Sequence, residues 1–132
     1  MPISFSIDLR ASLIRTIGSG YVTPAEVNAH FDQLSQVWPR GRRLDVLLDF
    51  SGCTSLPEIQ NLRDAVSRIQ MLGGRKRFGH CAIVATRGPL YGLLRVFELL
   101  ADRRFAAVRV FRNERAAMAW LRERSLAVRP GT

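Results

Sequence analysis

Residues 80–86, with the sequence HCAIVAT, form an almost wholly apolar segment. A strand that is apolar on both faces must be covered by other elements on both faces, as the central strands of α/β proteins are. Residues 44–50 (LDVLLDF) have a similar character and are predicted to form a second buried strand. A sheet built on these two strands requires helices to cover it, so the predicted fold class is α/β.

Further strands and helices are predicted around this centre. Apolar and polar residues alternate over residues 3–9, and residues 13–17 continue as a second strand, so the two are predicted to pair antiparallel. Residues 108–111 predict a short last strand. Four helices are predicted from residues that can satisfy or accommodate the free N–H groups of a helix start. These starts are Thr23-Pro24-Ala25-Glu26, Ser55-Leu56-Pro57-Glu58, Gly88-Pro89 and Asn113.

The predicted order is β-β-α-β-α-β-α-β-α, a mixed-sheet α/β sandwich with helices packed on the sheet. One domain is predicted over residues 1–126, followed by a frayed tail over residues 127–132. The chain has 132 residues, 47% of them hydrophobic and 23% charged, a balance typical of one soluble domain. The N-terminal residues lack the pattern of a signal peptide, and no apolar run has the length of a membrane span. A cytoplasmic protein is therefore expected.

The cysteines and histidines predict neither a disulfide framework nor a metal site. Cys53 and Cys81 are too few for a scaffold, and His30 and His80 are isolated from other metal-ligating residues. The sequence also has no phosphate loop, dinucleotide-binding fingerprint or nucleophile elbow. We therefore expect no metal, no cofactor and no catalytic residue.

The net charge of +9 comes from 20 basic and 11 acidic residues, and three basic runs each follow a predicted helix. Loops that follow helices meet at the amino edge of such a sheet, so these runs are expected to gather there. We call this set the basic rim; it comprises Arg40, Arg42, Arg43, Arg75, Lys76, Arg77, Arg103 and Arg104. Two interpretations stay open. One is that these charges stabilise helix ends and keep the protein soluble, and the other is that they form a surface for an anionic partner. Specific nucleic-acid binding is not expected, because no stacking aromatic residues are evident there.

The carboxyl edge, where ligand sites of open α/β sheets lie, is expected to collect polar residues. Helix starts at Ser55 and Gly88 offer free N–H groups that suit an anion, and Arg87 adds a positive charge. Tyr91 is expected one turn into the third helix, close to Arg87. The alternative is that the serines and threonines only cap helices and make turns. The candidate ligand-binding or partner-binding residues are Ser51, Thr54, Ser55, Arg87, Tyr91 and Arg95.

Several short segments carry a family resemblance. They are Leu47-Leu48-Asp49-Phe50-Ser51 ahead of the helix from Ser55, Ala82-Ile83-Val84-Ala85, Tyr91-Gly92-Leu93-Leu94-Arg95-Val96-Phe97, Arg109-Val110-Phe111 and Ala117-Met118-Ala119-Trp120-Leu121. In this order they resemble the STAS fold of sulfate transporters and anti-sigma factor antagonists. The chain is most similar to a bacterial group related to sporulation stage II protein AA. The resemblance covers nearly the whole chain in element order.

The resemblance also implies a regulatory switch that this sequence lacks. Anti-sigma factor antagonists of this fold carry an Asp-Ser-Ser step at the start of the helix, and a kinase phosphorylates one serine to control partner binding. Counting from Asp49, the matching positions here hold Pro57, Glu58 and Ile59. Ser55 is the nearest hydroxyl and is expected to cap the helix.

From the resemblance we expect a bacterial, non-enzymatic, regulatory or protein-interaction module that forms a homodimer and lacks the usual phosphorylatable serine. One alternative is a sensor or carrier of a small anionic or lipid-like ligand at the carboxyl edge. Another is a weak electrostatic nucleic-acid binder that uses the basic rim.

Overall fold

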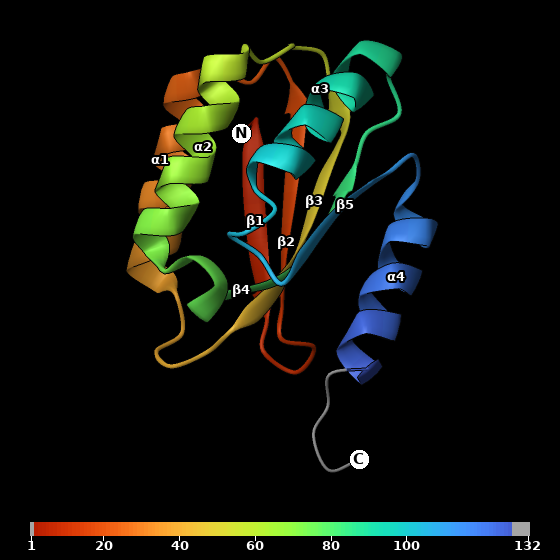
Figure 1. Ribbon diagram of the computed structural model, residues 1–132. Helices are drawn as coiled ribbons and strands as arrows, with labels where there is room; N and C mark the ends of the chain where they lie inside the picture. Colours follow the sequence, from red (N-terminus) through yellow and green to blue (C-terminus); the bar gives the residue numbers. More distant parts are fainter. Residues whose placement is uncertain (1, 128–132) are drawn as a thin grey trace.

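Five strands form one mixed sheet in the order β1-β2-β3-β4-β5 (Figure 1). The computed structural model describes residues 2–127. The strands are β1 (Ile3–Asp8), β2 (Leu13–Gly20), β3 (Leu44–Cys53), β4 (Phe78–Val84) and β5 (Ala107–Phe111). β1 pairs antiparallel with β2, and every later pair is parallel. This arrangement confirms the predicted antiparallel pair and the mixed α/β sheet.

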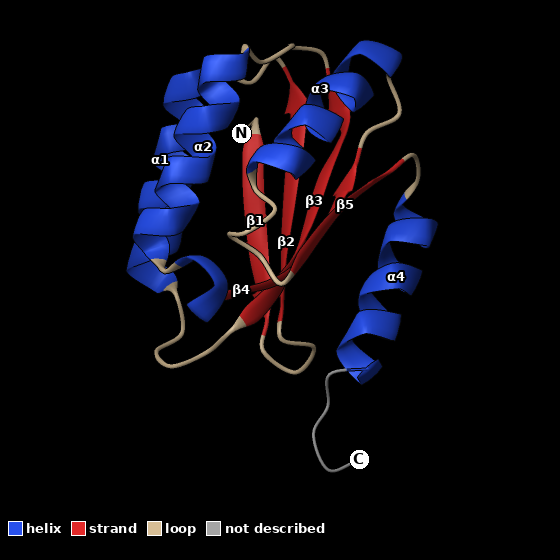
Figure 2. Cartoon of the chain, in the orientation of Figure 1, coloured by secondary structure: helices blue, strands red, loops and turns tan. Residues whose placement is uncertain are grey.

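Helices cover the sheet from both sides. They are α1 (Pro24–Val37), α2 (Ile59–Leu72), α3 (Gly88–Leu100) and α4 (Glu114–Ala127), with a short 3₁₀ helix, η1 (Gly74–Lys76). The first three α-helices lie on one face and α4 lies on the other (Figure 2). α4 includes Ala127, the first residue of the predicted tail, and residues 128–132 lie outside the described residues. Within residues 2–127, no helix combines the length and the hydrophobicity needed to cross a bilayer.

β4 is the centre of the fold. All of its residues are buried, because the α1–α3 layer covers one face and α4 covers the other. This confirms a buried central strand, although the strand begins two residues earlier, at Phe78, and ends at Val84, so that the predicted Thr86 is exposed and lies outside it. The ring of Phe78 packs edge-on against the ring of Phe105, with 5.3 Å between centroids. Both aromatic residues therefore belong to the main core.

α4 packs on the sheet through a small core of its own. Its members are Leu13, Leu47, Ala82, Val84, Ala117, Trp120 and Leu121. The helix is capped by Asn113, whose Oδ1 accepts a hydrogen bond from the Ala116 N–H at 2.8 Å, as predicted. An ion pair between Arg15 of β2 and Glu114 joins the first turn of the helix to the sheet. α4 packs mainly on β3, β4 and β5.

Candidate functional site

The carboxyl ends of β2, β3 and β4 meet at one edge of the sheet, at the top in Figure 1. The loop between β3 and α2, residues 54–58, lies there and is called the edge loop below. The Thr54 N–H donates to the Gly20 carbonyl at 2.8 Å. Arg87 Nη1 donates to the carbonyls of Cys53 and Thr54 at 3.3 and 3.0 Å. Arg87 therefore fixes the edge loop to the start of α3.

Ser51 and Ser55 both form hydrogen bonds inside the protein. Ser51 donates to Asp49 Oδ1 twice, from its hydroxyl at 2.6 Å and from its N–H at 3.0 Å. Ser55 Oγ accepts a hydrogen bond from the Val22 N–H at 2.9 Å. Ser55 therefore links the edge loop to the segment between β2 and α1.

The prediction that Ser55 caps α2 is wrong. The helix begins at Ile59 and its N-cap is Glu58, whose N–H donates to Asn61 Oδ1 at 2.9 Å. A residue that precedes proline disfavours the helical conformation, so Pro57 keeps the chain extended where a cap at Ser55 would require a first turn. The Ser55 oxygen accepts the Val22 N–H, a donor outside α2.

The start of α2 exposes apolar side chains beside an acidic one. Leu56 is 49% exposed and Ile59 is 41% exposed. Glu58, which lies between them in the sequence, is also exposed. The first turn of α2 and the residues before it therefore present an acidic side chain next in sequence to exposed apolar ones.

Tyr91 and Arg95 form a separate group on α3. The guanidinium of Arg112, which follows β5, lies 4.1 Å from the centre of the Tyr91 ring in a cation–π contact. Arg95 Nε lies 3.7 Å from a carboxylate oxygen of Glu98. Tyr91 faces Arg112, whereas the Arg87 guanidinium contacts the edge loop, so the six candidate residues divide into two groups.

The basic rim lies in the segments that lead from helices into β3, β4 and β5, at the edge opposite the edge loop. Its side chains have different roles. Arg42 Nη2 donates to the Leu9 carbonyl at 2.7 Å and to Ser12 Oγ at 2.9 Å, so it fixes the turn between β1 and β2. Arg104 Nε is buried and has no hydrogen-bond partner within residues 2–127. Part of the rim is therefore structural, and part is exposed charge.

Neither cysteine has the properties of a nucleophile. Burial raises the pKa of the Cys81 thiol, and burial together with the Asp49 carboxylate raises the pKa of Cys53. A raised pKa keeps a thiol protonated at neutral pH, whereas the thiolate is the reactive form. Among the described residues, no group of three or more His, Cys, Asp and Glu side chains is placed to hold a metal ion.

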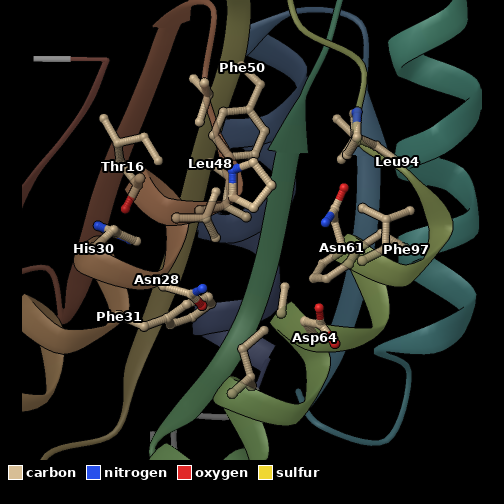
Figure 3. A pocket seen from close by; sticks show the side chains of 18 of the residues that line it. Thr16, Asn28, His30, Phe31, Leu48, Phe50, Asn61, Asp64, Leu94 and Phe97 are labelled. Carbon is tan, nitrogen blue, oxygen red and sulfur yellow. The ribbon is translucent and has the colours of Figure 1, made fainter.

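A cavity of about 180 Å³ lies between α1, α2 and the sheet face that they cover (Figure 3). Its lining includes two buried polar residues, Thr16 of β2 and His30 of α1, that the sequence analysis did not select. His30 stands three residues after Val27 and directly before Phe31, both of which also line the cavity. This helical spacing is the signal that indicates an inward position for His30.

The sheet order, the one-sided α1–α3 layer and the exposed start of α2 define an α/β domain of the STAS type. The model of the SpoIIAA-like family matches residues 13–122, and the chain belongs to this family. No curated protein sequence shows significant similarity to it.

Two solved structures share the fold. One is an uncharacterized protein of the DUF3478 family with a SpoIIAA-like fold, from Shewanella loihica PV-4. It is 18% identical with a TM-score of 0.62, over 90% of this chain and 93% of that chain. The other is an anti-sigma factor antagonist from Mycobacterium paratuberculosis, 17% identical with a TM-score of 0.59, over 91% of this chain and 94% of that chain. These likenesses confirm the fold that the family resemblance implies.

Proposed function

We propose that this protein is a non-enzymatic regulatory module that binds a partner protein through the edge loop and the first turn of α2. The partner is a regulator of the anti-sigma type, a class suggested by the anti-sigma factor antagonist of the same fold. The observation that carries the proposal is that Glu58 is exposed and stands in the sequence between Leu56 and Ile59, whose side chains are also exposed. Apolar side chains around a charge offer a partner both buried area and a fixed orientation.

The support beneath the edge loop favours this use. Arg87 binds two carbonyls at its start, and the Val22 N–H binds the Ser55 hydroxyl. A binding surface that is already held in one conformation loses little conformational entropy when a partner docks.

Binding is proposed to be independent of serine phosphorylation. Glu58 supplies a constant carboxylate at the position where the family resemblance places a phosphorylated serine. A phosphoryl group on Ser55 would have to fit beside the Val22 N–H that its oxygen accepts, a contact that fixes the edge loop.

A photo-crosslinking residue at position 56 tests this surface in living cells. We expect a photoreactive phenylalanine analogue in place of Leu56 to capture one discrete protein, identified by mass spectrometry as a sigma-factor regulator. The matched control places the analogue at Leu99, which is 78% exposed near the opposite end of the helical layer. We expect this control to capture no discrete protein.

Ile59→Asp should separate binding from folding. We expect it to reduce the position-56 adduct about ten-fold, the effect of losing about 1.4 kcal/mol of binding energy. The melting temperature should stay within about 2 °C, because an exposed side chain contributes little to stability. The proposed surface would be rejected by equal adducts at positions 56 and 99, or by an adduct that survives Ile59→Asp. Capture of only a second copy of this chain would also reject it. Stoichiometric phosphate on Ser55 would reject the constitutive mode of binding.

A further inference from the structure

The cavity between α1, α2 and the sheet is a feature separate from the partner surface. Most of its wall is apolar, with contributions from β2, β3, α1, α2 and α3. An engineered protein cavity of roughly 150 Å³ is large enough to hold benzene. The cavity of about 180 Å³ in this protein is therefore suited to a slightly larger molecule and too small for a lipid with two acyl chains.

Two polar side chains that line the cavity each carry an atom without a hydrogen-bond partner in the described residues. Thr16 Oγ1 and His30 Nδ1 form no hydrogen bond with any group of residues 2–127. Thr16 is 1% exposed and His30 is 9% exposed, so both side chains are more than nine-tenths buried. A buried polar atom without a partner carries an energetic cost that a ligand hydrogen bond would remove.

The two polar side chains lie on the same side of the cavity. Thr16 is the cross-strand neighbour of Phe5 in the β1–β2 pair. The ring of His30 lies 5.3 Å from the ring of Phe5, centroid to centroid. Figure 3 shows both side chains on the part of the wall formed by β2 and α1. The two side chains therefore form one polar part of the cavity wall.

The cavity offers no positive charge to an anion. Within the described residues, its lining contains no lysine or arginine, and Asp64 of α2 adds a carboxylate. Burial lowers the pKa of His30 to about 4, so its imidazole is neutral at pH 7. A neutral imidazole has one donor nitrogen and one acceptor nitrogen, which suits a hydroxyl group.

We propose that this cavity binds a small, neutral, mainly apolar molecule of about ten non-hydrogen atoms whose one hydroxyl group bonds to Thr16 and His30. Binding is independent of the proposed partner protein. Ser55 and Pro57 of the edge loop also line the cavity, so the bound molecule lies directly behind the partner surface.

Three probes of similar size separate the possible chemistries. Phenethyl alcohol carries an aromatic ring and a hydroxyl group, ethylbenzene lacks the hydroxyl group, and phenylacetate replaces it with a carboxylate. Each is titrated by calorimetry into the purified full chain without any partner protein, so the outcome does not depend on the proposed function. We expect saturable binding of phenethyl alcohol, about five-fold weaker binding of ethylbenzene, and no binding of phenylacetate.

Two variants assign the binding to this cavity. Thr16→Val keeps the shape of the side chain and removes the hydroxyl group. We expect it to weaken phenethyl alcohol binding about five-fold, to leave ethylbenzene binding unchanged, and to raise the melting temperature of the free protein. Ala65→Phe places a ring in the cavity from a half-buried position on α2 and is expected to abolish binding of both probes.

The proposal is overturned if phenylacetate binds most tightly, or if phenethyl alcohol shows no saturable binding up to about 10 mM. Equal affinities for phenethyl alcohol and ethylbenzene in the unsubstituted protein would also overturn it. If Thr16→Val does not fold, Ala65→Phe decides the location, because unchanged binding in that variant places the probes elsewhere.

Discussion

Replacing Trp120 by alanine is expected to lower the free energy of unfolding by about 3–5 kcal/mol. Trp120 is 7% exposed, and its ring packs against His80 and Phe111 with centroid distances of 6.0 and 5.7 Å. α4 is the one helix on this face among the described residues, so no neighbouring helix can fill the space that the ring leaves. The melting temperature should fall by roughly 10–20 °C for a chain of this length.

Thermal unfolding followed by circular dichroism measures this effect, and Trp120→Phe is the matched control. The control keeps an aromatic ring and removes the indole N–H, which is buried without a hydrogen-bond partner in the described part of the chain. We therefore expect it to cost far less stability than alanine. A Trp120→Ala protein that melts within about 2 °C of the unsubstituted protein would show that α4 is not part of the folded core.

Gly79→Ala is expected to cost about 3 kcal/mol, although it adds only one methyl group. Gly79 lies in β4 beside Asp45 of β3, where the register between the two strands shifts. A Cβ atom at residue 79 would overlap Asp45 Oδ1. That oxygen accepts the hydrogen bond of the His80 N–H at 2.8 Å, so moving it leaves a buried donor without its partner.

Urea unfolding of Gly79→Ala and Gly92→Ala gives the comparison. Gly92 is exposed in α3 and a Cβ atom there meets nothing within 4 Å, so this control should gain about 1 kcal/mol from its higher helix propensity. Adding Asp45→Ala to Gly79→Ala should cost less than the sum of the single changes, because the overlap is then absent. Strict additivity, or a loss under about 0.5 kcal/mol for Gly79→Ala, would contradict this account.

Local signals were enough to predict the order of the elements. The Thr23 hydroxyl accepts from the Glu26 N–H at 3.2 Å and a Glu26 carboxylate oxygen accepts from the Thr23 N–H at 2.9 Å, as the predicted capping box requires. The strand ends were less predictable. β2 and β3 extend beyond their apolar runs because they continue to pair as far as Gly20 and Cys53. Such pairing joins distant segments and leaves little trace in the local pattern of side chains.

For the candidate site, the residue types were predicted from the sequence, but most of their hydrogen-bond contacts were not. Ser55 has the local signature of a helix cap, yet its oxygen bonds to Val22, 33 residues earlier. Arg87 was expected close to Tyr91, and the Tyr91 N–H does donate to the Arg87 carbonyl at 2.8 Å, but the Arg87 guanidinium contacts the carbonyl of Thr54. Both contacts depend on how β2, β3 and β4 bring their loops together, and no local pattern specifies that geometry.

The cavity also influences how the folded protein responds to pressure. Internal space that side chains do not fill is eliminated when a chain unfolds, so the unfolded state occupies the smaller volume and pressure favours it. Close-packed protein interiors have low compressibility. A space of about 180 Å³ beneath α1 and α2 is expected to make that layer more compressible than the fully buried β4 beneath α4. Compression should therefore act first on the layer of α1 and α2, and a molecule that fills the cavity should stiffen it.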